Sequence, residues 1–219
     1  MRYVGWSDFE LCRAFNREYN NNKAQWSDLA YKMLGILGNH AAEFQKANIV
    51  VKVIRLEEDN TMNESISLPP FKFMDIIQQD WEDSDLFTYF EETKFFFVIY
   101  KRDGQVYRVS DCKFWNMPYN DLKVTVRNEW ESIKNTIISG VTFYKKQTKS
   151  GVLVKNNLPG SRDNEIIHVR PHAIMSAYRL NDGFTRGNVE RDANELPNGE
   201  YMTTQSFWIN NSYIERQIL

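Results

Sequence analysis

The sequence has few cysteines and histidines, and it contains no long apolar run. Two cysteines, Cys12 and Cys112, lie far apart and follow no metal spacing, which excludes a disulfide framework and a zinc site and predicts two core thiols. No apolar stretch reaches the roughly 18 residues of a membrane span. The segment MRYVGWSDFELCRAF lacks the basic and apolar regions of a signal peptide, so a cytoplasmic protein without a membrane partner is expected.

The net charge of −2 conceals an uneven distribution of charged residues. The chain of 219 residues, 42% apolar and 26% charged, suits one globular domain spanning residues 1–219. Residues 142–191 carry nine Lys and Arg against four acids, a net +5 that leaves −7 elsewhere. A local basic patch attracts a polyanion whatever the total charge, although a charge run is as often an ordinary solvated face.

Hydrophobic periodicity predicts a domain with a mixed sheet and flanking helices, of the α/β or α+β class. A helix is expected after Ser7, whose spacing to Glu10 suits a capping box, with further helices over 24–34 and 119–140. Strands are expected over 47–56, 65–68, 94–100, 106–114, 141–144, 151–155 and 165–170. Residues 179–197 lack a period and are expected to form a long surface loop, and 201–218 a terminal helix.

The stretch EIIHVRPHA, residues 165–173, reads as a buried strand that ends in polar residues around a proline. Pro171 stops a helix and holds the preceding residue extended, so Arg170 should project from a stiff strand end. The period of two then places His168, Arg170 and His172 on one face. His40 is the third histidine, and no HExxH is present, so a zinc protease is excluded. An arginine on such a face suits a phosphate or the two acceptors of guanine, whereas the alternative is a core histidine beside a surface ion pair.

Five further segments are distinctive when taken together: IVVK (49–52), ETKFFFVIYK (92–101), NEWESIKNTIISG (128–140), HVRPHA (168–173) and GEYMTTQSFWINNSYI (199–214). Together they resemble the MutH family of GATC-specific endonucleases. The similarity is greatest to the C-terminal, non-catalytic half of type II restriction enzymes that cut GATC and carry two MutH-like halves. The resemblance covers nearly the whole chain and implies the α/β restriction-endonuclease fold, with a central mixed β-sheet flanked by helices.

That family's active site is implied to combine an acid with Glu-x-Lys on a central strand, which together hold Mg²⁺ and activate water. Lys52 matches the lysine and Glu43 falls where the first acid would be, but Val50 replaces the metal-binding glutamate. A valine offers no ligand to a hard cation. These three residues are therefore expected to be degenerate remnants, with no catalytic residue and no metal in this chain.

The resemblance also implies which residues contact DNA. Arg170 and His172 fall on the family's Arg-Pro-Lys loop, which enters the major groove; histidine in place of lysine makes that contact weaker or dependent on pH. Tyr201 matches the tyrosine of the Tyr-Leu-Lys-Lys segment, in which Thr203 and Thr204 replace the lysines. Gln205 continues the same segment. On charge alone, backbone contacts are expected from Lys145, Lys146, Lys155 and Arg179, although ordinary surface cations are nearly as common.

Two functions follow from these residues. The first is an effector domain of a restriction–modification enzyme, which binds GATC duplex DNA and acts allosterically without hydrolysis or a cofactor of its own. Its partners would be an N-terminal catalytic MutH-like half in the same parent chain, which uses Mg²⁺, and a second copy on DNA. The second is an active Mg²⁺-dependent endonuclease in which Glu43 and one of Glu57, Glu58 or Glu64 replace the missing carboxylate. A domain with a protein partner is the remaining possibility.

Overall fold

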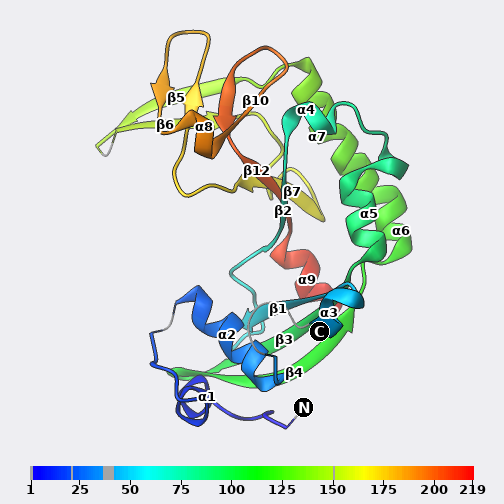
Figure 1. Ribbon diagram of the computed structural model, residues 1–219, viewed down its shortest axis with the longest axis vertical. Helices are drawn as coiled ribbons and strands as arrows, with labels where there is room; N and C mark the ends of the chain where they lie inside the picture. Colours follow the sequence, from blue (N-terminus) through cyan, green and yellow to red (C-terminus); the bar gives the residue numbers. More distant parts are fainter. Residues whose placement is uncertain (1, 21, 37–41, 150) are drawn as a thin grey trace. The chain divides into compact units, whose positions relative to one another are not determined.

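The computed structural model describes residues 2–20, 22–36, 42–149 and 151–219, without the side chains of Ala42 and Glu43. These residues form two compact units, each with helices and strands (Figure 1). Unit 1 comprises Met1–Ser65, Thr88–Pro118 and Asn211–Leu219, and unit 2 comprises Ile66–Phe87 and Tyr119–Asn210. The α/β class is confirmed. The described helices include none that is both long and apolar enough to cross a lipid bilayer.

Unit 1 is built on a mixed sheet of order β1-β3-β4. Its strands are β1 (Ile49–Leu56), β3 (Lys94–Asp103) and β4 (Val106–Trp115). Strands β1 and β3 are parallel, while β3 and β4 form an antiparallel hairpin that turns at Gly104, whose φ is +60°. The run KFFFVIY is the buried central strand that its composition predicts, because residues 95–100 are all buried.

The helices of unit 1 are α1 (Asp8–Ala14), α2 (Lys23–Met33), α3 (Ala42–Lys46) and α9 (Asn211–Ile218). The predicted capping box opens α1, since the Ser7 hydroxyl accepts from the Glu10 N–H and the Glu10 carboxylate accepts from the Ser7 N–H. One face of the sheet packs against α1 and α2. That core contains Leu11, Cys12, Trp26, Leu29, Phe96, Val98 and Tyr100.

Unit 2 contains a three-stranded antiparallel sheet of order β2-β12-β7 and a long helix. The strands are β2 (Ile66–Phe71), β12 (Gln205–Ile209) and β7 (Ile167–Pro171). Strand β2 tolerates Pro69 and Pro70 because it lies at the edge of the sheet. The helical segments are α4 (Phe73–Ile76), η1 (Trp81–Asp83), α6 (Tyr119–Asp121), the π-helical η2 (Leu122–Val126), α7 (Arg127–Ser139) and α8 (Val189–Asp192). Helix α5 (Asp85–Glu92) begins in unit 2 and ends in unit 1.

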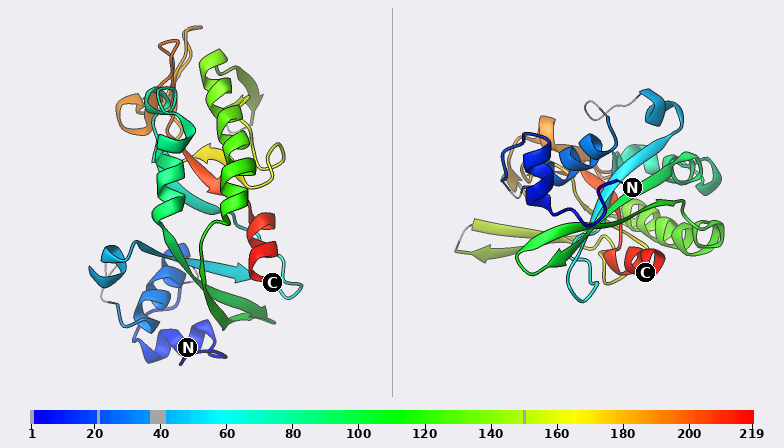
Figure 2. Two further views of the ribbon diagram at one scale, coloured as in Figure 1. Left: turned by 90° about the vertical axis from the view of Figure 1, so that its right-hand side faces the viewer. Right: turned by 90° about the horizontal axis from the view of Figure 1, so that it is seen from below.

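Two smaller sheets complete unit 2. One has the order β10-β11-β8-β9, and the other is the hairpin β5-β6, which reaches outward from the other strands of its unit (yellow-green in Figures 1 and 2). Their strands are β5 (Phe143–Thr148), β6 (Gly151–Asn156), β8 (Tyr178–Arg179), β9 (Thr185–Arg186), β10 (Ala193–Glu195) and β11 (Tyr201–Thr203).

Two predicted segments differ from the structure. Residues 179–197 are not one long loop, because β8, β9, β10 and α8 interrupt them; strands of two or three residues are too short to show a period. Residues 201–218 are not one helix, because only Asn211–Ile218 is helical and the preceding residues form β11 and β12. Four of the five residues of β12 are buried, so the strand lacks the alternation that would distinguish it from a helix.

The described strands form four small sheets rather than one central sheet. The expected central mixed sheet corresponds to the mixed sheet of unit 1, and the three sheets of unit 2 are antiparallel. The chain divides into two compact units, and the expectation that residues 1–219 form one domain remains a prediction.

Candidate nucleic-acid interface

Glu129 anchors the start of β7. Its carboxylate, on the buried side of α7, accepts from the backbone N–H groups of Glu165 at 2.5 Å, Ile166 at 3.0 Å and Ile167 at 2.7 Å. Burial raises the pKa of Glu129, while the N–H groups act in the opposite direction. These bonds fix the start of β7 against α7, and they therefore help to position the far end of the strand.

The register of β7 against β12 assembles a polar cluster at that far end. Ser206 pairs with Arg170 and Trp208 pairs with His168, so all four side chains share one face of the sheet. The exposed guanidinium of Arg170 lies over the Trp208 ring, 5.4 Å from its centroid. His172 follows, with its Nδ1 3.3 Å from the Ser206 hydroxyl. We call Arg170, His172, Ser206 and Trp208 the Arg170 cluster.

His168 belongs to the same face but is fully buried. Burial lowers the pKa of His168 to about 4, and the charge of Arg170 acts in the same direction. The imidazole is therefore neutral at neutral pH and withdrawn from any ligand. It fits the alternative expected from the sequence, a core histidine, whereas Arg170 and His172 reach the surface.

A short loop, residues 172–177, follows β7 and is exposed from His172 to Met175, while Ala177 is buried. The His172 N–H donates to the Thr204 carbonyl at 2.7 Å, which fixes the start of the loop. Ile174 is 82% exposed and Met175 is 59% exposed. Gly187 lies against the other end of the loop, where a Cβ would meet the Ser176 carbonyl at 2.4 Å, so a side chain is sterically excluded there.

Arg179 and Tyr201 are brought together by the pairing of β8 with β11, in which they are direct partners. The Arg179 guanidinium lies 4.1 Å from the centre of the Tyr201 ring. Such stacking leaves the guanidinium edge free to donate hydrogen bonds while the ring restricts its motion.

Thr203 and Gln205 are buried and bonded to the backbone. The Thr203 hydroxyl accepts from the Ala177 N–H at 2.9 Å, and the Gln205 amide donates to the Thr203 carbonyl at 2.8 Å. Both side chains are 1% exposed. The expectation that they contact DNA gains no support from this burial, and their bonds instead hold β8, β11 and β12 together.

The β5–β6 hairpin separates the three expected lysines onto two faces. Lys145 lies on the face whose neighbours Phe143 and Val154 are half-buried, and it forms an ion pair with Asp182. On the opposite face, Tyr144, Lys146, Leu153 and Lys155 are all exposed. Tyr144 pairs with Lys155 and Lys146 with Leu153, so cations and apolar groups alternate across it. We call these four residues the outer hairpin face.

Within the described part of the chain, Lys146, Lys155, Arg170 and Arg179 are exposed and form no ion pair with a carboxylate. All four belong to unit 2. Unpaired cations beside aromatic rings, namely Tyr144, Tyr201 and Trp208, are typical of surfaces that bind nucleic acid.

Sequence reasoning missed Tyr144, Leu153, Ile174 and Trp208. The alternation of lysines with apolar residues in FYKKQT and GVLVKN could have predicted the outer hairpin face. The role of Trp208 depends on the register of β7 and β12, which pairs residues 40 positions apart (168 with 208) and leaves no local signal.

The expected nuclease remnant lies in unit 1. Val50 and Lys52 share one face of β1, as Glu-x-Lys would, and their partners on β3 are Phe95 and Phe97. Burial lowers the pKa of Lys52. Glu43 lies in α3, but its side chain, like all of His40, is outside the described residues. The described residues contain no group of three His, Cys, Asp or Glu that could hold a metal ion.

The carboxylates considered as replacements are held at the other end of β1. Glu57 accepts from Arg102 at 3.0 Å and from the Tyr107 hydroxyl at 2.8 Å, and Glu64 pairs with Arg55 at 2.8 Å. Glu58 accepts from the Gly104 N–H. At about 3.3 Å per residue, seven positions along an extended strand separate Val50 from Glu57 by about 23 Å. Glu58 and Glu64 bond to Gly104 and Arg55, near the same end of the strand.

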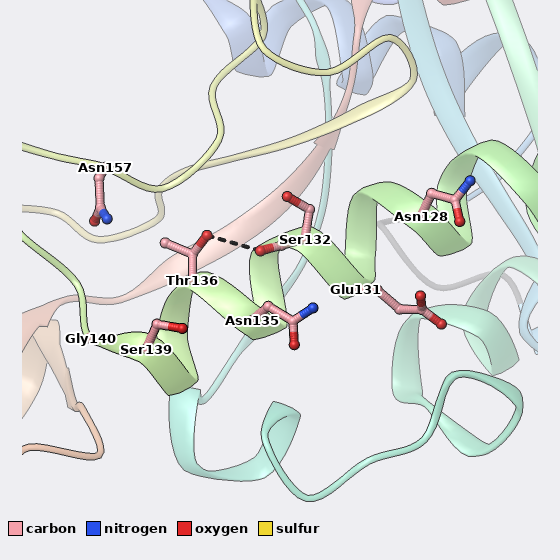
Figure 3. Close-up of a pocket in the computed structure, with 8 residues that line it drawn as sticks. All are labelled: Asn128, Glu131, Ser132, Asn135, Thr136, Ser139, Gly140 and Asn157. Atoms are coloured by element: carbon pink, nitrogen blue, oxygen red, sulfur yellow. Dashed lines mark hydrogen bonds between the residues drawn. The ribbon is translucent and has the colours of Figure 1, made fainter.

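A shallow groove of about 520 Å³ follows the exposed side of α7 (Figure 3). Its walls are amides and hydroxyls, including the Thr136 hydroxyl, which donates to the Ser132 carbonyl at 2.9 Å. Glu131 is the charged residue among those that line it, and Arg127 pairs with its carboxylate at 2.8 Å. The groove offers no unpaired cation to a polyanion, so the cationic surface of unit 2 is the candidate interface.

Comparison with known proteins shows sequence similarity to a type II restriction enzyme. It is similar to the type II restriction enzyme Sau3AI of Staphylococcus aureus, with 30% identity over 239 aligned positions, which cover 99% of this chain and 49% of that enzyme. The chain thus spans about half the length of this relative. The resemblance to one half of a restriction enzyme is therefore confirmed. No protein-family profile matches the chain.

Proposed function

We propose that this chain is a sequence-specific duplex DNA-binding domain that recognises GATC as the effector half of a type II restriction enzyme. The observation that carries the proposal is the Arg170 cluster, an unpaired guanidinium supported by an indole on a fixed strand end. Arginine donates two parallel hydrogen bonds to the O6 and N7 acceptors of guanine, and a rigid mount is what such a contact needs. The similarity to a restriction enzyme over nearly the whole chain supports duplex DNA as the ligand.

Cations beyond the Arg170 cluster would hold the phosphates. Lys146 and Lys155 project from the outer hairpin face, and Arg179 is supported by Tyr201. Contacts of this kind set affinity and register without reading sequence. We assign no DNA contact to Thr203 or Gln205, and Lys145 has a weaker case because Asp182 neutralises it.

We infer that the domain does not cut DNA by itself. The restriction-endonuclease fold that we propose would place the metal-binding carboxylate at position 50, and valine there cannot bind Mg²⁺. Glu57, Glu58 and Glu64 are held elsewhere, which favours this proposal over an active nuclease with relocated ligands. Mg²⁺ and hydrolysis would belong to a catalytic half in the parent chain, which GATC binding by this domain would stimulate, with self-association on DNA as a further step.

Two substitutions test the assignment of base and phosphate contacts. Arg170→Ala should weaken binding to a GATC duplex by about 1–3 kcal/mol and reduce discrimination against a permuted duplex. Lys146→Ala should weaken binding to both duplexes alike, because a phosphate contact carries no sequence information. Fluorescence anisotropy with both duplexes measures the two effects. Equal losses on both duplexes for Arg170→Ala would remove the base-reading role, and the absence of salt-sensitive binding would favour a protein partner instead.

A further inference from the structure

The chain exposes several apolar side chains from Pro171 to Met175, on either side of His172. Pro171, Ala173, Ile174 and Met175 are all exposed, and Ile174 is 82% exposed. Single exposed apolar residues are ordinary, but here four of five consecutive positions are apolar and exposed, next to Arg170 and around His172. The surface therefore combines hydrogen-bonding groups and hydrocarbon within a few residues.

A groove of about 530 Å³ borders three of these apolar residues. Pro171, Ala173 and Ile174 line it together with His172, whereas Met175 does not. The remaining walls are Thr204 and the ion pair of Arg191 with Asp192. The groove thus has an apolar wall next to an imidazole, and its mouth adjoins the strand end that carries Arg170.

The edge of a thymine in the major groove has the complementary pattern. It presents the O4 acceptor beside the C5 methyl group, and this methyl distinguishes thymine from every other base at that position. Apolar side chains recognise the methyl group by burying it, with a gain of about 0.8 kcal/mol per buried carbon. A donor next to an aliphatic wall fits this edge better than it fits guanine, which has two acceptors and no methyl group.

We propose that Ile174 is a specificity-determining residue that contacts the thymine methyl group of the recognition site. The proposal rests on the proposed GATC function and adds the second base of the read-out, because Arg170 accounts for guanine and leaves thymine unassigned. Ile174 buries part of its exposed side chain against the methyl group, and His172 lies on the side of the O4 acceptor.

The test combines removal of the thymine methyl group from the DNA with removal of the Ile174 side chain from the protein. Anisotropy titrations compare a GATC duplex, the same duplex with uracil for both thymines, and a permuted duplex. The wild-type chain should bind the thymine duplex about three- to fivefold more tightly than the uracil duplex, as expected for a buried methyl group. Ile174→Ala should bind both equally. Met175→Ala, a matched change on the same loop outside the groove, should keep the wild-type preference.

Two outcomes separate this inference from the function on which it rests. Equal wild-type binding to GATC and to the permuted duplex overturns the proposed function. If the wild-type chain prefers GATC but binds the uracil duplex as tightly as the thymine duplex, the thymine contact alone is overturned. The same holds if Ile174→Ala keeps the full preference for the thymine duplex. Ile174 is exposed, so its substitution leaves the core intact, and a circular-dichroism melt verifies folding.

Discussion

At the scale of single residues, Glu129 links the helix α7 to the strand that carries the Arg170 cluster. Three backbone N–H groups donate hydrogen bonds to its carboxylate, and together they engage both carboxylate oxygens. Burying a carboxylate without hydrogen-bond donors costs free energy, and so does burying backbone N–H groups without an acceptor. The carboxylate of Glu129 and the three N–H groups each offset the desolvation cost of the other.

Glu129→Gln should lower the free energy of unfolding by about 2 kcal/mol, because an amide offers one oxygen and turns an N–H toward a backbone donor. DNA binding should weaken as well, since the start of β7 loses its anchor. Urea unfolding and anisotropy measure the two effects. Glu131→Gln, on the exposed side of the same helix, should change each by less than about 0.5 kcal/mol. Equal effects of the two substitutions would contradict the anchoring role.

His168 gives the stability a defined pH dependence. Its pKa is about 4 in the folded chain and near 6.5 when unfolded, so the unfolded state takes up a proton first as the pH falls. The contribution of the neutral imidazole is fully present above pH 6.5 and is lost between about pH 6.5 and 4, by up to about 3 kcal/mol. His168→Gln should flatten the unfolding free energy in that window. Parallel profiles of wild type and variant would show that His168 is not buried and neutral.

The residues at the end of β7 could be predicted because their signal is local. A β-branched run closed by proline indicates a strand end, and Arg170 and His172 are the polar residues at that end. Thr203 and Gln205 could not be distinguished from surface residues, because their burial depends on Ala177 and on the pairing of β11 with β8. Ile174 is also outside the reach of sequence, since nothing local shows that an isoleucine is exposed.

At the scale of elements, the β5–β6 hairpin shows how strand alternation sorts neighbouring charges. Lys145 and Lys146 are adjacent in sequence, yet one is paired with Asp182 and the other belongs to the outer hairpin face. Two lysines of equal formal charge therefore differ in what they offer to a polyanion.

Substitution of the two lysines should separate their roles. Lys146→Ala should reduce the slope of log K against log salt by about 1, because one phosphate contact is lost. Lys145→Ala should leave the slope nearly unchanged, since an ion pair on the inner face is lost instead. Binding titrations at several salt concentrations measure the slopes. An unchanged slope for Lys146→Ala would show that the outer hairpin face does not contact DNA, and an equal loss for Lys145→Ala would show that the two faces do not differ in this respect.

Long periodic elements were predictable and short ones were not. The pattern of Leu122, Val126, Trp130, Ile133 and Ile137 indicated the helical segment that ends at Gly140, whose φ is +103°. The sheet β10-β11-β8-β9 consists of strands of two or three residues, which exist only because their partners are nearby. Propensity cannot reveal such pairing.

At the scale of the whole molecule, the sequence predicted the α/β class and the uneven charge but not the division into two compact units. The cations assigned to DNA belong to unit 2, and Val50 with Lys52 belongs to unit 1. Each unit draws on segments that are distant in sequence, so no composition change or linker marks the division. The central claim is that DNA binding persists in a chain whose nuclease position is occupied by a hydrocarbon side chain.

The most direct measurement incubates the purified chain with an end-labelled GATC duplex in Mg²⁺ and resolves bound and cleaved DNA on paired native and denaturing gels. We predict a salt-sensitive complex that forms on GATC in preference to a permuted duplex, with every strand intact. Strand scission by the chain alone, or equal retention of the two duplexes, would contradict the claim.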